Sequence, residues 1–398
     1  MLHSLLHTWA NNRGVHELEH GQMEANERGT TRVSGMPDRP ERLMSLDALR
    51  GFDMFWIIGA DALVESLAKV SHSGFLGLLA HQLSHAEWEG FRFYDLIFPL
   101  FIFMVGISTV FSLERTIAEG GKKSACLRIL RRFALLWFWA FIYSGGFAQE
   151  QISFAGVLQR ISYCYLITSL LFLNLRLRGL IFVCVGILVA YWALMTFVPV
   201  PELGRPTFDM HTNWANYMDR HYLPGEREER GWRNEGMLST LPAVATCLLG
   251  VFAGLLMKSG SIVPARKVTL LVAGGLGLLV LGYLWGLQFP IIKRIWTSSY
   301  VLVAGGYSCL LLAMFHALID LREYRKWAAP FVWIGANSLT IYLIAGLIPY
   351  EALTSRIVSG PVQQWLGPYD AVAKTILALG LAIVLMRFMY QRKIFLRV

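Results

Sequence analysis

Charged residues are scarce in this sequence. Only 16% of its 398 residues are Asp, Glu, Lys or Arg, whereas soluble domains carry about 25%. The deficit extends along the whole chain, while 55% of the residues are hydrophobic and the mean hydropathy is +0.48. We therefore expect the lipid bilayer to be the main solvent of this protein.

Cysteine is scarce too, and the five cysteines show no spacing typical of a zinc site or a disulfide framework. Four lie within apolar runs and Cys126 lies in a basic loop, so we interpret them as small buried apolar residues. We expect no metal cofactor. The net charge of +9 does not indicate a nucleic-acid partner, because the basic residues form short clusters between apolar runs, as membrane topology requires.

The first 41 residues lack a sustained apolar stretch, so they do not resemble a secretory signal peptide. They are polar and contain four irregularly spaced histidines, a composition that favours a disordered cytoplasmic tail over a metal site. We predict this tail over residues 1–41 and a transmembrane domain over residues 42–398.

Long apolar runs dominate the rest of the chain. A spanning helix needs about 20 mostly apolar residues, and about ten segments qualify, which predicts an all-α polytopic bundle of about ten transmembrane helices. The third segment is short and contains two glycines. The segments are residues 48–64, 93–113, 133–147, 157–175, 180–198, 237–257, 268–287, 298–319, 328–347 and 371–390.

Basic residues mark alternate connections between these segments. By the positive-inside rule, the side that carries them is cytoplasmic, and both termini lie on that side if there are ten spans. The long loop over residues 199–235 also holds five arginines, but long loops determine topology less strongly. The basic clusters are Lys122, Lys123, Arg128, Arg131 and Arg132; Arg176 and Arg178; Lys258, Arg266 and Lys267; Arg322, Arg325 and Lys326; and Arg392, Lys393 and Arg397.

Gly250 and Gly254 form a GxxxG step in one of these segments. Small residues at this spacing let two helix backbones approach closely. The step indicates close packing either within the bundle or at the seam of a homodimer.

Ionisable residues in or beside the spans are costly, at about 2.5–3.5 kcal/mol each near a helix centre, and therefore point to function. Asp47, Arg50 and Asp53 are three residues apart at the start of the first span, so they share a helix face. Two interpretations stay open for them: a helix start that neutralises its own charges, or a cytoplasmic mouth where Arg50 meets a phosphate.

The first outward loop is the richest in groups that can move protons. Asp61 and Glu65 lie at the outward end of the first span, and His85 follows in the segment HAEWEG (85–90). A histidine oriented by a carboxylate can act as a general base near neutral pH or as a nucleophile that carries an acyl group. Asp95 can orient His85 only if the chain folds back, because ten residues separate them.

Further polar residues lie inside later spans. Arg160, Asn337, His316 and Asp320 could each form a hydrogen bond between helices. Together they indicate a polar cavity through the bundle, which favours an enzyme or a transporter over a structural protein.

At these residues the sequence resembles the heparan-α-glucosaminide N-acetyltransferase family, in particular its bacterial relatives, from about residue 42 to the C-terminus. Many short motifs occur in the family's order, and together they carry the resemblance. They are SLDALRG (45–51), HAEWEG (85–90), DLIFPLF (95–101), GVLQR (156–160), NEG (234–236), LST (238–240), WTSSY (296–300), GANS (335–338) and RKIF (392–395).

The resemblance implies acetyl transfer across a bacterial inner membrane, from cytoplasmic acetyl-CoA to an amino sugar or glycan on the far side. It assigns the active histidine to His85, which would act as a base or form an acetyl-histidine. Asp61 and Asp95 are the candidate partners of His85, although animal members have asparagine at the position of Asp61. The alternative function is a transporter or flippase for a small polar solute, which would use Asp61, Arg160 and Asn337. An internal repeat, common in transporters, is not apparent.

The same resemblance suggests which residues hold acetyl-CoA. Arg50 and the basic inner loops would bind its phosphates, and Arg160 lies within a motif of the fourth span. Asn337 or Tyr300 would donate hydrogen bonds to the oxyanion of the thioester.

Overall fold

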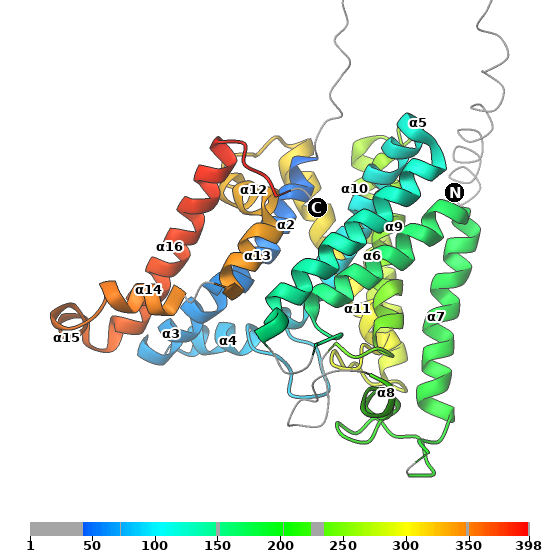
Figure 1. The fold of residues 1–398 in the computed structure, drawn as a ribbon, viewed down its shortest axis with the longest axis horizontal. Coiled ribbons are helices and arrows are strands. Elements are labelled where there is room, and N and C mark those ends of the chain that lie inside the picture. The colour runs from blue at the N-terminus through cyan, green and yellow to red at the C-terminus, as the bar shows by residue number, and fades with distance from the viewer. Residues whose placement is uncertain are drawn as a thin grey trace, which may run out of the picture.

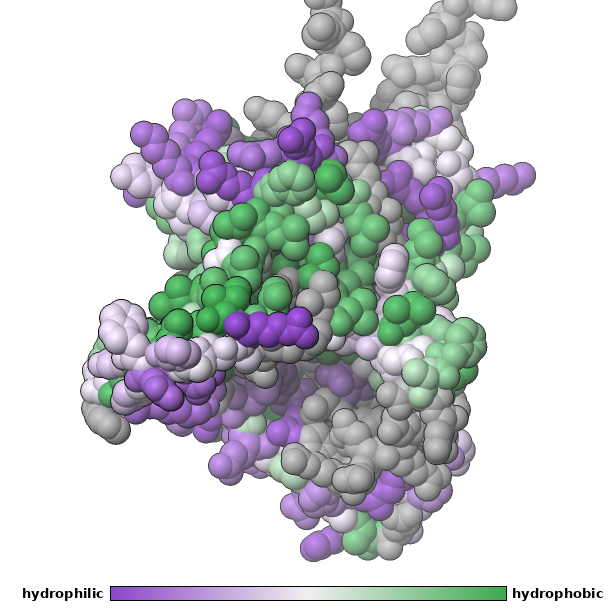
Figure 2. Space-filling view, turned by 60° about the vertical axis from the view of Figure 1, so that its left-hand side comes forward, coloured by the Kyte–Doolittle hydropathy of each residue, from purple (hydrophilic) through white to green (hydrophobic). Residues whose placement is uncertain are grey.

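Helices are the only regular elements in the described part of the chain (Figure 1). The computed structural model describes residues 43–71, 73–148, 152–201, 203–223, 235–347 and 350–396. Figure 2 shows hydrophobic side chains gathered in a band, with hydrophilic ones above and below it. The prediction of an all-α polytopic membrane protein is confirmed. The tail predicted over residues 1–41 lies outside the described residues.

The helices form two groups that stand side by side in Figure 1. One group comes from the middle of the chain and the other combines its beginning and its end. The first contains α5 (Phe93–Tyr143), α6 (Val157–Asn174), α7 (Leu177–Phe197), α9 (Thr240–Lys258), α10 (Pro264–Gly286) and α11 (Ser298–Phe315). The second contains α2 (Met44–Phe55), η2 (Trp56–Ala60), α3 (Asp61–Ser71), α4 (Gly74–Gln82), α12 (Ala329–Ala336), α13 (Ser338–Leu347), α14 (Tyr350–Ile357), α15 (Pro361–Leu366) and α16 (Asp370–Gln391).

Helix α5 is a hairpin of two arms rather than one rod. Gly121 has φ 71°, a conformation that suits glycine, and it reverses the chain between the arms at 93–120 and 121–143. The arms meet beside this bend, where Arg128 Nη1 donates to Thr116 Oγ1 at 3.0 Å. The bend lies at the end of the molecule where α2 begins and α16 finishes (Figure 1). We call this the basic end, because the predicted basic clusters lie there, and the opposite end the site end. Short α8 (Trp214–Tyr222) lies at the site end.

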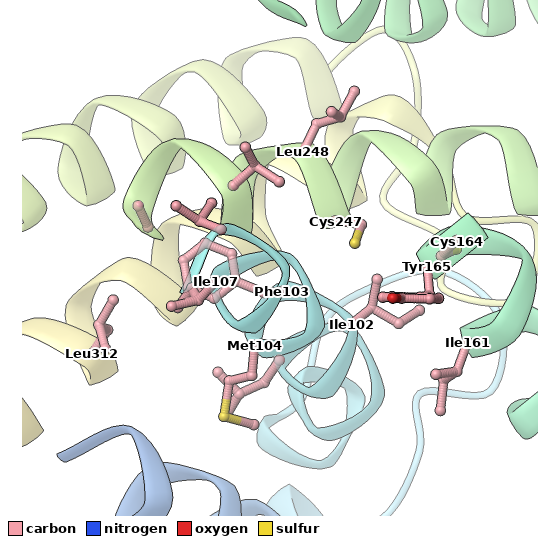
Figure 3. Close-up of a cluster of buried hydrophobic side chains, with 14 of the residues drawn as sticks. Ile102, Phe103, Met104, Ile107, Ile161, Cys164, Tyr165, Cys247, Leu248 and Leu312 are labelled. Atoms are coloured by element: carbon pink, nitrogen blue, oxygen red, sulfur yellow. The ribbon is translucent and has the colours of Figure 1, made fainter. Parts of the chain in front are cut away.

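The core packs the first arm of α5 against α9 and α6, as the side chains in Figure 3 show. A Cβ on Gly250 would lie 1.9 Å from the Phe103 carbonyl oxygen, and one on Gly254 would lie 3.0 Å from the Cα of Ile107. The GxxxG step therefore packs inside the bundle, against α5. Four cysteines are buried and Cys126 is partly exposed, as expected for small apolar residues.

All ten predicted segments fall on helices. Among the described residues, six helices are long and apolar enough to cross a membrane by themselves, or seven if α12 and α13 count as one span. Helix α6 is not among the six, and the rest of the difference from about ten has local causes. The two arms of α5 form one element, and the first segment is divided between α2, η2 and α3. Helices α12 and α13 are bent by 75° at Asn337.

Candidate functional site

The loop between α4 and α5 holds His85 at the site end. Gly90, at φ 115°, adopts a conformation that side chains rarely allow, and its N–H donates to the Ile291 carbonyl oxygen at 2.9 Å. Arg92 ties the loop from the other side, donating to Ser84 Oγ at 2.7 Å and to the His85 carbonyl oxygen at 2.9 Å. The loop is thus fixed against the first turn of α5 and against the α10–α11 connection.

Asp95 in the first turn of α5 is the hydrogen-bonding centre of this loop. Its Oδ2 accepts from the N–H groups of Ala86 at 3.2 Å and Arg92 at 3.1 Å, so the carboxylate caps the N-terminus of the helix. Its Oδ1 lies 2.9 Å from His85 Nδ1. The chain therefore folds back across ten residues, and of the two candidate partners of His85 the structure brings Asp95 into contact.

Lys293 is the third member of the cluster and was not found from the sequence. Its Nζ lies 3.1 Å from His85 Nδ1 and 3.4 Å from Asp95 Oδ1. Burial lowers the pKa of the Lys293 ammonium to about 8, while the attraction of Asp95 acts in the opposite direction. A lysine at the site end departs from the positive-inside rule, and this departure was the signal in the sequence that could have identified it.

A rigid turn places Lys293. The Ile292 N–H donates to Thr297 Oγ1 at 3.0 Å, and the Trp296 N–H donates to the Lys293 carbonyl oxygen at 3.0 Å. Trp296 has φ 54°, which is strained for a tryptophan and typical of functional sites. Its buried indole compensates by packing on Tyr300 and donating to Thr246 Oγ1 at 3.1 Å.

A cavity of about 310 Å³ extends from this cluster into the bundle. Its polar mouth contains His85, Asp95, Lys293, Arg294 and Glu235. Its inner part is apolar and lies between the two helix groups, because the walls come from α2 and η2, both arms of α5, α6 and α13. The inner wall includes Met54, Ile57, Phe98, Phe101, Tyr143, Val157, Leu158, Ile161, Leu339 and Tyr342.

Asp61 lies near this site but contacts a different residue. Its carboxylate hydrogen-bonds to the hydroxyl of Tyr94, and it also accepts from the Ala62 N–H at 2.8 Å. The Tyr94 ring stacks on His85 with 4.8 Å between the ring centroids. Asp61 therefore reaches His85 only through Tyr94.

Arg160 and Tyr300 support the site from behind. Arg160 is buried, donates to the Gly236 carbonyl oxygen at 3.3 Å and to the Ser239 hydroxyl, and lies 4.8 Å from the centre of the Trp296 ring. The buried Tyr300 hydroxyl donates to the Asp95 carbonyl oxygen at 2.7 Å. Both are thus occupied in holding residues that line the cavity.

Arg50 and Asn337 do not line the His85 cavity and form hydrogen bonds elsewhere. Arg50 donates to Asp47 Oδ1 at 3.0 Å and to Ser108 Oγ at 2.8 Å. Asn337 Nδ2 donates to the carbonyl oxygen of Ile394, beyond the end of α16, at 3.1 Å. The structure therefore does not bring Arg50 or Asn337 into the cluster around His85.

The fold and the cluster define a multi-pass helical membrane protein with a histidine–carboxylate–lysine site at one face of the bilayer. The family model described as "Heparan-alpha-glucosaminide N-acetyltransferase, catalytic" matches residues 42–275, which is more than half of the chain. The chain belongs to this family. The matched region includes His85, Asp95, Asp61, Arg50 and Arg160.

Two curated relatives are similar over most of this chain. Heparan-alpha-glucosaminide N-acetyltransferase of Homo sapiens is 23% identical, over 93% of this chain and 61% of the relative. The protein of the same name in Mus musculus is 22% identical, over 79% of this chain and 56% of the relative. The chain thus spans about three-fifths of the length of these relatives.

Proposed function

We propose that this protein is a membrane acetyltransferase that moves an acetyl group from acetyl-CoA to the amine of an amino sugar or related glycan. The observation that carries the proposal is the cluster of His85, Asp95 and Lys293 at the mouth of a cavity that continues into the bundle. Membership of the family and the names of the two relatives support the reaction type.

His85 supplies the base. Asp95 engages Nδ1, so Nε2 is the ring nitrogen left to react. An acceptor ammonium releases one proton to solvent, its nitrogen attacks the thioester carbon, and the C–S bond breaks as the C–N bond forms. Nε2 takes the second N–H proton and passes it to the departing thiolate. Nε2 can instead attack the thioester first, which would form an acetyl-histidine that the amine then cleaves.

Lys293 stabilises the negative charge that develops in either route. Its ammonium group lines the cavity beside His85, with Arg294 next to it. Cationic donors fixed in a partly desolvated site stabilise an oxyanion more strongly than water does. We assign this role to Lys293 rather than to Tyr300 or Asn337, because both of those donate to backbone carbonyls instead.

We further propose that the basic end faces the cytoplasm, with both termini there, in a bacterial inner membrane. The basic clusters at that end support this orientation. Acetyl-CoA would approach from the basic end and the glycan acceptor from the site end, where His85 is half exposed.

The broken helices favour a second candidate, a transporter or flippase for a small polar solute. Helix α2 is interrupted at η2, and α12 and α13 are bent by 75°; these interrupted elements pack on one another. Discontinuous helices that meet near mid-membrane are frequent in transporters. Accumulation of a solute in proteoliposomes without CoA would support this candidate.

The experiment that decides is an acetyl-transfer assay with purified full-length protein, acetyl-CoA and a panel of amino sugars and cell-envelope glycans. We expect the wild type to acetylate at least one acceptor. The His85→Ala variant should be inactive, although a thermal unfolding measurement should show that it is folded. The proposal would be overturned if the wild type acetylates none of the acceptors, or if His85→Ala has unchanged turnover. Incubation with labelled acetyl-CoA in the absence of acceptor distinguishes the two routes. The acetyl-histidine route leaves label on His85, and direct attack by the amine does not.

A further inference from the structure

Helix α4 leads directly into the loop that carries His85, and it is apolar on all sides up to its last two residues. Its nine residues, GFLGLLAHQ, include Phe75, Leu76, Leu78 and Leu79, and none of the nine is buried. Phe75 is 68% exposed and Leu78 is 59% exposed. A helix that is apolar all round normally lies inside a protein core or in a membrane. Because the described part of the chain leaves α4 uncovered, we expect lipid to cover it.

The lipid-facing side of α10 approaches the same site along a different segment of the chain. Exposed apolar residues follow one another on this candidate span at steps of three or four, namely Leu276, Val280, Leu284 and Leu287. Leu287, at the end of the helix, is 86% exposed. The connection that follows it carries Lys293, and its Ile291 carbonyl oxygen accepts from the Gly90 N–H at 2.9 Å. Apolar surface therefore adjoins both of the chain segments that form the His85 cluster.

The end of α4 sets the depth of His85 relative to the bilayer. His85 is three residues beyond Gln82, the last residue of α4, so their Cα atoms are at most about 11 Å apart. A bilayer has a hydrocarbon core of about 30 Å within a total thickness of about 40–45 Å, which leaves roughly 5–8 Å for the headgroup layer on each face. With α4 in contact with lipid, the imidazole lies in the headgroup layer or directly beside it.

Helices α3, α4, α14 and α15 lie together at the site end, where α14 and α15 project sideways from the bundle (Figure 1). We call these four helices the shelf. None of the residues of α15 is buried, and its Trp365 is 85% exposed. Tyr369, three residues beyond α15, is exposed as well. Tryptophan and tyrosine are enriched at the level of the lipid headgroups, where helices with exposed apolar residues lie in the membrane plane.

The shelf continues the lipid-facing surface of a membrane span. Helices α3 and α14 both pack on α16, and α16 is a candidate span that is mostly unburied. Its exposed apolar residues include Ile376 and Val384. The lipid that covers α16 can therefore extend over the shelf as far as α4 and the His85 loop.

We propose that the shelf lies in the headgroup layer at the site end and that the acceptor is an amino sugar carried by a membrane lipid. Its amine would be held at His85, with its lipid tail in the leaflet beside α4. The inference rests on the proposed function, because it names the class of acceptor for the same site. The ammonium gains the acetyl group and loses two protons, one to solvent and one to the departing thiolate of CoA. A lipid anchor confines the amine to the depth of His85 and so raises its effective concentration there.

Spin labels in lipid vesicles measure the depth of the shelf without turnover. The labels are attached to Leu78→Cys in α4, Val280→Cys in α10 and Arg205→Cys in an exposed loop, each in full-length Cys126→Ser protein, whose other native cysteines are buried. Relative to a water-soluble nickel chelate, oxygen should collide more often with the label at Leu78 than with the label at Arg205, and most often at Val280. Equal ratios at Leu78 and Arg205 would overturn the placement of the shelf.

A matched pair of acceptors tests the substrate class. Octadecyl β-glucosaminide and methyl β-glucosaminide have the same amine and differ only in the alkyl chain. With protein in vesicles and acetyl-CoA on both sides of the membrane, kcat/KM should be at least roughly tenfold higher for the octadecyl compound. Equal use of the two compounds, or a preference for the methyl compound, would overturn the inference and leave the proposed function standing.

Variants of α4 link the preference for the lipid-anchored acceptor to the shelf. The double variant Phe75→Gln, Leu78→Gln removes apolar side chains that are exposed and therefore not needed for the core. It should lower the ratio of octadecyl to methyl turnover roughly tenfold, because contact with lipid is lost. Tyr222→Gln, an exposed residue of α8 outside the shelf, is the control and should keep the wild-type ratio.

The measurements separate this inference from the proposed function. An unchanged ratio in the double variant would contradict the role of α4. If the Leu78 label lies in the headgroup layer but no amino sugar of any kind is acetylated, the depth of the shelf stands and the proposed function is overturned. Transfer to soluble glycans alone would overturn the lipid-carried acceptor and support the proposed function.

Discussion

At the scale of single residues, the site joins an exposed ring to a buried anion. The His85 side chain is 49% exposed, whereas Asp95 is 1% exposed. Asp95 is fixed by two backbone N–H groups and by the start of α5, so it can orient His85 without moving. The imidazole is therefore accessible both from solvent and from the cavity.

Replacing this pair should lower turnover more than stability. We expect His85→Ala to reduce kcat about 10²–10⁴-fold through loss of the base. Asp95→Asn should cost at least roughly tenfold, because the charged hydrogen bond to Nδ1 is lost. Steady-state assays of purified variants measure both. Glu89→Gln, in the same loop but outside the cavity, is the control and should retain wild-type turnover.

Lys293 gives the reaction a predicted pH dependence. With a pKa lowered to about 8 by burial, the side chain is an ammonium below this pH and a neutral amine above it. If the ammonium stabilises the oxyanion, kcat falls as the pH rises through 8, by roughly tenfold between pH 7 and pH 9. Lys293→Met should be slow at both pH values.

The control for this pH profile is Lys293→Arg, because a guanidinium stays charged throughout the range. With the same acceptor in both assays, kcat of Lys293→Arg should no longer fall as the pH rises through 8. The acceptor must be the same because its own amine also titrates. A profile for Lys293→Arg that matches the wild type would show that Lys293 does not set the alkaline limb.

At the scale of elements, the walls of the His85 cavity depend on helices that touch at their backbones. A Cβ on Gly51 of α2 would lie 1.7 Å from the Phe331 carbonyl oxygen, and one on Gly335 of α12 would lie 1.8 Å from the Asp47 carbonyl oxygen. This contact holds α2 where Met54 and Ile57 can line the cavity. The motifs SLDALRG and GANS thus meet in space.

Gly51→Ala should therefore destabilise the protein by about 1–3 kcal/mol, since α2 and α12 must separate. Thermal unfolding of the detergent-solubilised protein measures the change. Gly380→Ala in α16 is the matched control, because a Cβ there meets no atom within 4 Å; it should leave the unfolding temperature unchanged or raise it, as alanine favours helix. Equal effects of the two substitutions would contradict the close contact.

At the scale of the whole molecule, the two ends differ in charge and in the reactive groups that they expose. Cys126, at the bend of α5, is the partly exposed thiol among five free cysteines, and the other four are buried. It thus reports which side of the membrane the basic end faces.

A membrane-impermeant maleimide should label Cys126 in inside-out vesicles and not in right-side-out vesicles, if the basic end is cytoplasmic. The Cys126→Ser variant should take up no label in either preparation. Labelling from the outside alone would reverse the proposed orientation, and the donor and acceptor sides with it.

The amino-acid sequence by itself determined the solvent, the helices and the loop that carries the candidate site. Scarcity of charge and long apolar runs specify a membrane bundle, because an unpaired backbone or charge in lipid is too costly. All ten predicted segments lie on helices for this reason. His85 was predicted from the motif HAEWEG, and Asp95 was one of two candidate partners for it.

Only the tertiary structure decided which groups meet. Lys293 reaches His85 from 208 residues away, and no periodic pattern encodes which loops touch at one end of a bundle. The amino-acid sequence did not decide between Asp61 and Asp95 as the partner of His85. In the structure Asp61 contacts Tyr94 and Asp95 contacts His85. Tyr300 and Asn337 have suitable donors, but their hydrogen bonds go to distant backbone carbonyls. The burial of an apolar segment follows from its local composition. The hydrogen-bond partner of a polar side chain depends instead on the positions of helices that are far apart in the chain.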